Sequence, residues 1–232
     1  SLMGPKARDV FSQVTDADVS NDAFAFGSSQ EIYIAGAPTK ALRVTYVGEL
    51  GWELHFPIEH ALEVYEALMQ AGEPYGIGNA GYRAIESLRL EKGYRAWASD
   101  IGPDYSPLEA GMAWAVKMKT NTPFIGREAI AAQKEEGLKK RLACFTIDDP
   151  DVVLMGRETI YRNGERVGWL SSGGWGYTVE MNIGYGYVRN EDGVSLEYLK
   201  EGTYELDVAT KRIPCTIQFG ALVDPAMERV KC

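Results

Sequence analysis

From Arg141 onward the sequence is a series of short β-rich runs with no amphipathic helical stripe between them. The runs read LACFTI, ETIYRNG, RVGWLSSGG, NIGYGYV, TYELDV and IPCTIQFG. Asp-Pro, Asn-Gly, Gly-Gly and Asp-Gly pairs lie between them and favour tight turns. A series of short strands and turns of this kind is typical of a small all-β barrel or sandwich, and this part is predicted to fold as one.

The preceding part of the chain has strand signals first and helix signals afterwards. Residues 31–35, 42–47 and 52–56 alternate between apolar and polar side chains, which predicts three strands. Strands that precede helices in this way are typical of an α+β domain, in which helices cover one face of an antiparallel sheet. We therefore predict an α+β fold followed by a small all-β barrel.

Three helices are expected after these strands. The first follows Pro57 and ends near Gly72, with an apolar stripe of Ile58, Ala61, Leu62, Tyr65, Leu68 and Met69. The second covers about residues 80–92, with Gly93 as its stop and with Ala84, Ile85 and Leu88 facing inward. The third, residues 126–139, is polar and should be exposed.

The basic stretch LKKRL lies where the helix pattern gives way to the β pattern. It is the expected linker between two domains, residues 1–138 and residues 139–232. No internal repeat of fixed period is visible in either part.

Composition excludes several classes of partner. The chain has 232 residues, a formal net charge of −9 and a pI near 4.9, so it lacks the basic surface that nucleic acids or anionic membranes require. No apolar run approaches the ~20 residues that cross a bilayer. We expect neither a nucleic-acid partner nor a membrane partner.

The three cysteines and two histidines are too few and too scattered for a disulfide framework or a metal site. They fit a reducing compartment, the cytoplasm or the mitochondrial matrix. Cys144 lies within the apolar run LACFTI and is expected to be a small buried hydrophobe rather than a nucleophile.

The stretch TYVGELGWELHF, residues 45–56, predicts a hairpin with an unusual polar face. If its turn lies between residues 49 and 50, Tyr46 lies directly opposite Glu53. The other face carries Thr45, Val47, Trp52, Leu54 and Phe56 and should meet the helices. An aromatic ring beside a carboxylate suits a flat heterocycle with an amidine-like N–H and amino edge. The alternative is an ordinary cross-strand pair that contributes only to stability.

Four segments in order resemble the aminomethyltransferase family, the T-protein of the glycine cleavage system. YVGELGWELHFP is similar to its Tyr-Thr-Gly-Glu-x-Gly-x-Glu signature, and AGYRAIESLRLEKGYRAW to its following helix. DYSPLEAGMAWAVKMKTNTPFIGREAI resembles the segments after that helix. Within the family, the amino-acid sequence of these segments is most similar to the folate-binding C-terminal region of sarcosine and dimethylglycine dehydrogenases.

The resemblance implies a set of ligand-binding residues. In the family, the tyrosine and the second glutamate of the signature bind the pterin of tetrahydrofolate, and they match Tyr46 and Glu53. Arg89 matches the arginine of the family's Leu-Arg-Leu-Glu, whereas Ile85 stands where another family arginine is found. Arg83 is a candidate to replace it; the alternative for Arg83 and Arg89 is a surface ion pair with Glu86.

Three other features have more ordinary interpretations. SSGGWGYT, from Ser171 onward, resembles a family segment and is expected to form a turn rather than a phosphate loop, because no helix follows it. Glu91 and Lys92 are expected to be solvated or capping charges. Three aromatic residues could line a pterin pocket, although core packing is the stronger expectation for them: Tyr94, Trp97 and Trp114.

The family transfers a one-carbon unit to tetrahydrofolate, with a carboxylate that steers proton movement. In the family this aspartate lies in the N-terminal third of the fold, upstream of the residues present here, so no catalytic residue is assigned. A flavin-binding Gly-x-Gly-x-x-Gly is not present either, so FAD would bind only in an upstream domain. The expected partners are folate, a small methylated amine or aminomethyl donor, and a flavin domain or subunit.

Three functions from different classes remain open. The favoured one is the tetrahydrofolate-binding portion of a one-carbon transferase, as part of a sarcosine or dimethylglycine dehydrogenase-like enzyme. The second is a non-catalytic binding or regulatory module with the same architecture, which the replacement of an arginine by Ile85 favours. The third is an interaction scaffold without a small ligand.

Overall fold

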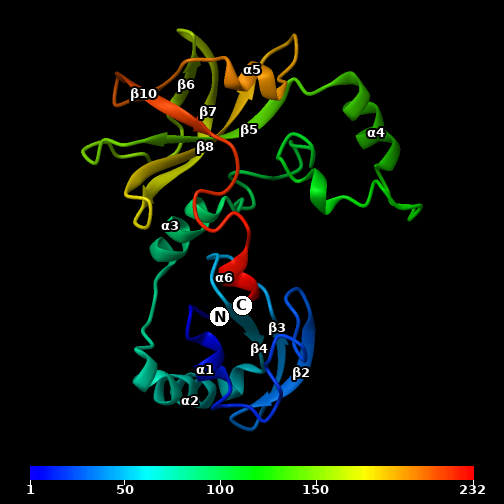
Figure 1. The fold of residues 1–232 in the computed structure, drawn as a ribbon, viewed down its shortest axis with the longest axis vertical. Coiled ribbons are helices and arrows are strands. Elements are labelled where there is room, and N and C mark those ends of the chain that lie inside the picture. The colour runs from blue at the N-terminus through cyan, green and yellow to red at the C-terminus, as the bar shows by residue number, and fades with distance from the viewer. The chain divides into compact units, whose positions relative to one another are not determined.

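The computed structural model describes all 232 residues, which form two compact units. The first unit consists of Ser1–Lys92 and Val223–Cys232, and the second of Gly93–Leu222. Figure 1 shows that each unit has its own antiparallel β-structure. The fold is therefore α+β followed by a β-barrel, as the sequence predicts.

The compact units divide at a different place from the domain boundary expected after residue 138. Residues ahead of that boundary contact the barrel: the main-chain N–H of Leu142 donates to the oxygen of Glu109 at 2.8 Å. The rings of Tyr105 and Tyr187 also stack, with centroids 3.9 Å apart. These contacts join the segment after residue 92 to the barrel, and the boundary at 138 stays a prediction about domains.

The sheet of the first unit has four strands in the order β1-β4-β3-β2. These are β1 (Leu2–Met3), β4 (Gly51–His55), β3 (Ala37–Leu42) and β2 (Ser29–Ile34), and every neighbouring pair is antiparallel. The strands expected over residues 31–35 and 52–56 correspond to β2 and β4. The strand expected over residues 42–47 is wrong, because β3 ends where it was to begin.

The register of the predicted hairpin is also wrong. Leu42, not Tyr46, lies opposite Glu53. The chain leaves the ladder after Leu42, and the Thr45 hydroxyl then accepts the main-chain N–H groups of Val47 and Gly48 at 3.2 and 3.1 Å. A short polar side chain that bonds the backbone in this way favours a turn over a continued strand.

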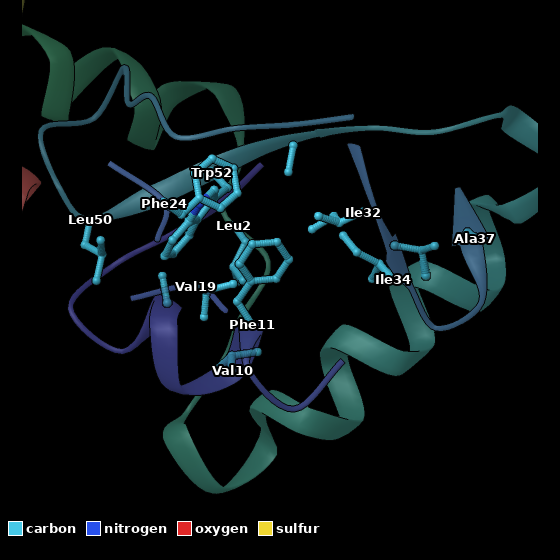
Figure 2. Packing of buried hydrophobic residues seen from close by; sticks show 13 residues of the cluster. Leu2, Val10, Phe11, Val19, Phe24, Ile32, Ile34, Ala37, Leu50 and Trp52 are labelled. Carbon is cyan, nitrogen blue, oxygen red and sulfur yellow. The ribbon is translucent and has the colours of Figure 1, made fainter. Parts of the chain in front are cut away.

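The core of the first unit lies between the sheet and the helices α1 (Ala7–Phe11) and α2 (Ala61–Gly72), which cover the same face (Figure 2). Trp52 is fully buried there, and Leu54 packs against the same cluster, which confirms the apolar face predicted for β4. The other buried members of the cluster are Leu2, Ala7, Val10, Phe11, Val19, Phe24, Ile32, Ile34, Ala37, Ala41, Leu50 and Val64.

The face that helix α2 presents to the core matches the predicted stripe only in part, because Leu68 of that stripe packs against the core cluster as predicted. Val64 is fully buried, and Leu68 and Ala71 pack against the same cluster. Ile58 and Leu62, both placed in the predicted stripe, are 86% and 67% exposed. The buried face of the helix is therefore centred on Val64 and not on Leu62.

Substitutions at Val64 and Leu62 should distinguish the buried face of α2 from the exposed one by their different effects on the free energy of unfolding. We expect Val64→Ala to lower the free energy of unfolding by about 2 kcal/mol, because buried methyl groups are lost and a cavity forms. Leu62→Ala should change it by no more than about 0.5 kcal/mol, since that side chain is already in water. Urea denaturation followed by circular dichroism compares the two; an equal loss would mean that the stripe of Leu62 is the buried one.

The remaining helices agree in part with expectation. α3 (Tyr82–Lys92) ends at Gly93, whose φ of +72° supplies the predicted stop. α4 (Arg127–Glu136) has no buried residue, as predicted. Ala84, expected inward, is exposed, and the buried residues of α3 are instead Ser87, Arg89, Leu90, Glu91 and Lys92. The helix α6 (Glu228–Lys231) and three short 3-10 turns complete the set: Ile58–His60, Glu73–Tyr75 and Ala113–Ala115.

The second unit contains a closed antiparallel barrel with the strand order β10-β5-β8-β7-β6-β9, which confirms the all-β prediction. The strands are β5 (Lys140–Ile147), β6 (Thr159–Arg162), β7 (Glu165–Gly176), β8 (Met181–Arg189), β9 (Tyr204–Val208) and β10 (Lys211–Gln218), with the short helix α5 (Leu196–Lys200) before β9. Phe145, Ile160, Leu170, Val188 and Leu206 are fully buried in its core. No helix of either unit combines the length and the apolar composition needed to cross a membrane.

Candidate functional site

The candidate site is built on the loop of residues 43–50, here called the Tyr46 loop, between β3 and β4. Its first residue remains tied to the sheet, because Arg43 donates its main-chain N–H to Ser28 at 3.0 Å and accepts that of Gly27 at 2.8 Å. At its other end, Leu50 accepts the N–H of Gly4 at 2.8 Å. The loop is thus fixed at both ends, and Tyr46 lies half-buried between them.

Glu53 lies on β4, on the face opposite the core side chain Trp52. Its side chain is 41% exposed, and its carboxylate Oε2 lies 3.6 Å from Nε2 of His55. A carboxylate that is partly accessible keeps acceptor capacity for a ligand, and two oxygens can accept two parallel N–H donors. The placement of Glu53 on the non-core face agrees with the sequence prediction.

Tyr46 and Glu53 therefore do not form a cross-strand pair. Tyr46 belongs to the loop and Glu53 to the strand that the loop enters. Any ligand that contacts both must reach from the loop to the exposed face of β4. The ligand-binding role of the two side chains stays a prediction, and the geometry that the hairpin register assigned to them is wrong.

The two predicted arginines of α3 differ in environment. Arg83 is exposed in the first turn, whereas Arg89 is 2% exposed and donates from Nε and Nη2 to Oε2 of Glu86 at 3.0 and 2.7 Å. The pair with Glu86 was foreseen as a surface pair, but Arg89 is buried. Glu86 also accepts from Tyr82, and this hydrogen bond raises the pKa of the Tyr82 hydroxyl. Arg89 consequently supports the helix through Glu86.

A groove of about 530 Å³ lies next to the Tyr46 loop, with Val47 in its wall. Ile85 also lines it, so an apolar side chain faces this groove at the position where the family has an arginine. Other lining residues are Leu2, Val10, Tyr65, Leu68, Met69, Ile77 and Leu88. A larger hollow of about 810 Å³ beside α1 contains none of the predicted site residues, so volume alone does not locate the site.

Glu91 and Lys92 are not solvated charges, which corrects the sequence interpretation. Both are buried, and Lys92 Nζ lies 2.7 Å from Oδ2 of Asp224, with the two side chains 3% and 6% exposed. The main-chain oxygen of Glu91 accepts the N–H of Val223 at 3.1 Å. The last turn of α3 is therefore covered by a segment more than a hundred residues away in sequence.

The SSGGWGYT segment is part of strand β7 rather than a turn. Ser171 and Ser172 both donate to Oδ1 of Asp100, which is itself buried. The other carboxylate oxygen of Asp100 accepts the main-chain N–H of Ala96 at 2.9 Å. These hydroxyls serve a structural carboxylate, and the turn expected here begins only after Gly176.

The aromatic and cysteine predictions had different outcomes. Trp97 and Trp114 are 73% and 82% exposed, so core packing is wrong for both. Tyr94 is half-buried. Cys144 is buried as predicted, and burial raises the pKa of its thiol to about 12. No group of three or more His, Cys, Asp or Glu side chains in the structure could hold a metal ion.

Arg43 is a residue that the sequence reasoning missed. It is almost completely buried and donates from Nη1 to the oxygen of Phe24 at 2.7 Å and from Nη2 to that of Cys232 at 3.0 Å. Burial lowers the pKa of its guanidinium. An arginine within an alternating pattern is normally assigned to the polar face, and no local signal marked Arg43 as the residue that turns inward.

Comparison with known proteins identifies the family. The model of the GCVT N-terminal domain matches residues 1–120, and the model of the glycine cleavage T-protein C-terminal barrel domain matches residues 140–224. A crystal structure of glycine cleavage system aminomethyltransferase T from Bartonella henselae superimposes with a TM-score of 0.79 at 25% identity, over 96% of this chain and 58% of that one.

Two relatives match nearly all of the chain. Mitochondrial sarcosine dehydrogenase of Mus musculus is 46% identical over 233 residues, which is 100% of this chain and 25% of the relative. The mitochondrial pyruvate dehydrogenase phosphatase regulatory subunit of Mus musculus is 39% identical over 224 residues, 91% of this chain and 26% of the relative. The chain thus spans about a quarter of the length of these relatives. With one family model matching more than half of its residues and a second matching the barrel, the chain belongs to the glycine cleavage T-protein family.

Proposed function

We propose that this chain is the tetrahydrofolate-binding part of a one-carbon transferase, as a portion of a sarcosine or dimethylglycine dehydrogenase-like enzyme. Tyr46 and Glu53 hold the pterin ring. The observation that carries the proposal is the carboxylate of Glu53, which lies partly accessible on the non-core face of β4 beside the Tyr46 loop. The similarity to sarcosine dehydrogenase supports the same reading.

The donor and acceptor chemistry of the residues fits tetrahydrofolate. The two oxygens of Glu53 accept the N–H and amino edge of a pterin, and the phenol ring of Tyr46 offers it an aromatic surface. Arg83, exposed at the start of α3, is suited to the anionic tail of a folate, and Arg89 pairs with Glu86 one turn earlier in the same helix. When bound, tetrahydrofolate supplies the nitrogen that accepts the one-carbon unit.

In this proposal, Tyr46 and Glu53 orient tetrahydrofolate, the acceptor of the one-carbon unit, and do not transfer a proton in the reaction. Holding the pterin by two fixed groups contributes orientation, which lowers the entropic part of the barrier. No side chain of this chain is assigned to acid–base catalysis; in this proposal the family carboxylate and FAD would come from other parts of a dehydrogenase-like enzyme. We propose that the protein is cytoplasmic, or in the mitochondrial matrix if it is eukaryotic; its similarity to mitochondrial relatives supports the second location.

Calorimetric titration with tetrahydrofolate tests the role of Glu53. We expect Glu53→Ala to weaken binding about ten-fold or more, which corresponds to the ~1.4 kcal/mol that a lost charge-assisted hydrogen bond should exceed. Glu31→Ala is the matched control, because Glu31 is an exposed carboxylate on β2 of the same sheet. Its removal should leave the affinity unchanged. Equal binding by the unmutated chain and Glu53→Ala would remove Glu53 from the site.

A second candidate function is a non-catalytic binding or regulatory module. Ile85, which lines the groove in place of the family arginine, favours it, as does the similarity to a protein named as a phosphatase regulatory subunit. The two candidates differ in turnover: a full-length enzyme passes a one-carbon unit from a methylated amine to tetrahydrofolate, and a regulatory module does not. Absence of any folate binding by the unmutated chain would favour the third class, an interaction scaffold.

A further inference from the structure

The last ten residues, Val223–Cys232, return to the first compact unit after the whole second unit has intervened. We call this segment the C-terminal strap; it contains α6, which Figure 1 shows in red beside β3 and β4. Its contacts with the first unit are made by side chains and by the backbone, and several of them converge on the Tyr46 loop.

The strap is anchored by a buried ion pair. Lys92 Nζ donates to the carboxylate of Asp224 at 2.7 Å and to its main-chain oxygen at 2.5 Å. The same carboxylate accepts the main-chain N–H groups of Glu228 at 2.8 Å and Arg229 at 3.3 Å. Asp224 therefore fixes the start of the strap to α3 and at the same time organises the turn that leads into α6.

The lysine of this pair also forms the support of the Tyr46 loop. Gly48 has a φ of +80°, and a Cβ built on it would lie 2.8 Å from Cδ of Lys92. The backbone of the loop therefore rests directly on the aliphatic stem of Lys92. Only glycine meets both requirements at this position, the left-handed conformation and the close approach.

Two further contacts join the strap to the loop. Arg229 Nη1 lies 3.0 Å from Oε1 of Glu49, the residue after Gly48. At the other end of the loop, Nη2 of Arg43 donates to the main-chain oxygen of Cys232. The strap and its lysine thus contact the loop on both sides of Tyr46.

We propose that the C-terminal strap positions the Tyr46 loop for ligand binding, with Arg229 as a positioning residue that acts through Glu49. The inference rests on the proposed function of Tyr46. It assigns a binding role to residues that lie far from the site in sequence and do not themselves contact the ligand.

Variants at the contact between Arg229 and Glu49 distinguish a role in positioning the loop from a role in the stability of the fold. Arg229 is half-exposed, and exposed ion pairs contribute little to global stability. A change at this pair should therefore loosen the loop and leave the melting temperature nearly unchanged. A role in stability alone would show the opposite pattern.

Charge reversal at this pair, in the full 232-residue chain, is the test. We expect Arg229→Glu to weaken tetrahydrofolate binding several-fold in calorimetry and to speed amide hydrogen exchange in residues 44–50. Adding Glu49→Arg to Arg229→Glu restores the opposite charges and should return both quantities close to their original values. Lys231→Glu is the matched control, because it makes the same charge change on the exposed face of the same helix.

The outcomes distinguish this inference from the proposed function. If the unmutated chain binds tetrahydrofolate and Glu53→Ala weakens it, but Arg229→Glu does not, the positioning role is wrong and the folate site stands. An equal loss in Arg229→Glu and Lys231→Glu would mean that added negative charge repels the ligand, which also overturns the inference. If the unmutated chain does not bind tetrahydrofolate, the proposed function is wrong. If amide hydrogen exchange in residues 44–50 is then also unchanged in Arg229→Glu, the strap does not order the Tyr46 loop and the inference is wrong as well.

Discussion

Trp52→Ala is expected to lower the free energy of unfolding of the first compact unit by about 4 kcal/mol, the typical cost of removing a large aromatic side chain from a core. Trp52 is fully buried. Its ring lies 4.8 Å from that of Phe11 and 6.1 Å from that of Phe24, centroid to centroid (Figure 2). The side chain links β4 to α1, so its loss opens a cavity at the centre of the cluster.

The substitution also removes two cation–π contacts. The guanidinium carbons of Arg8 and Arg43 lie 5.9 and 5.8 Å from the ring centroid of Trp52. Arg43 is buried and would keep its charge in a less favourable environment, which adds to the cost.

Denaturation by urea, followed by circular dichroism, measures the effect of Trp52→Ala. Trp114→Ala is the matched control, because this tryptophan is mostly in water and its loss should cost no more than about 0.5 kcal/mol. A loss of less than about 1 kcal/mol for Trp52→Ala would contradict the packing described for this core.

Asp224→Ala is expected to cost about 3–5 kcal/mol, because it leaves the Lys92 ammonium buried without its partner. It also removes the acceptor for the N–H groups of Glu228 and Arg229. Replacing both partners, Lys92→Met with Asp224→Leu, should recover the part of the loss that comes from the unpaired lysine, since no buried charge then remains, although the two N–H groups still lack their acceptor. If the double variant were as unstable as Asp224→Ala, the unpaired lysine would not be the cause.

The same pair predicts a pH dependence. Burial by itself would raise the pKa of Asp224, but the hydrogen bond from Lys92 and those from the main-chain N–H groups outweigh it, and the pKa is lowered from 3.8. A carboxyl whose pKa is lower in the folded state contributes stability that is complete above its unfolded pKa of about 3.9 and is lost as the pH falls through its folded value. The difference in unfolding free energy between the original chain and Asp224→Ala should therefore be constant from pH 7 to about 5 and narrow below pH 4. A constant difference down to pH 2 would contradict this assignment.

Local sequence patterns were sufficient for the architecture. Six β-rich runs separated by turn dipeptides, with no helical stripe between them, predicted the barrel; they did not predict which strands pair, because β5 pairs with β8 and β10, and β6 with β9. Strands β2 and β4, the end of α3 at Gly93 and the exposed helix α4 follow from periodicity and stop signals in the same way. The carboxylate of Glu53 was correctly assigned to the non-core face of β4, since alternation along a strand fixes which side each residue takes.

Only the tertiary structure determined the register of the strands, the face of α2 that is buried and which charged residues are buried. The spacing of apolar residues predicts the type of an element but not the residues with which it pairs or packs. It therefore could not predict that the β3–β4 ladder ends at Leu42, or that Val64 rather than Leu62 is buried in the core. Lys92 appeared as a surface charge because its partner, Asp224, is 132 residues away. Contacts between distant segments depend on how the whole chain closes on itself, and that information is not contained in any local window of the sequence.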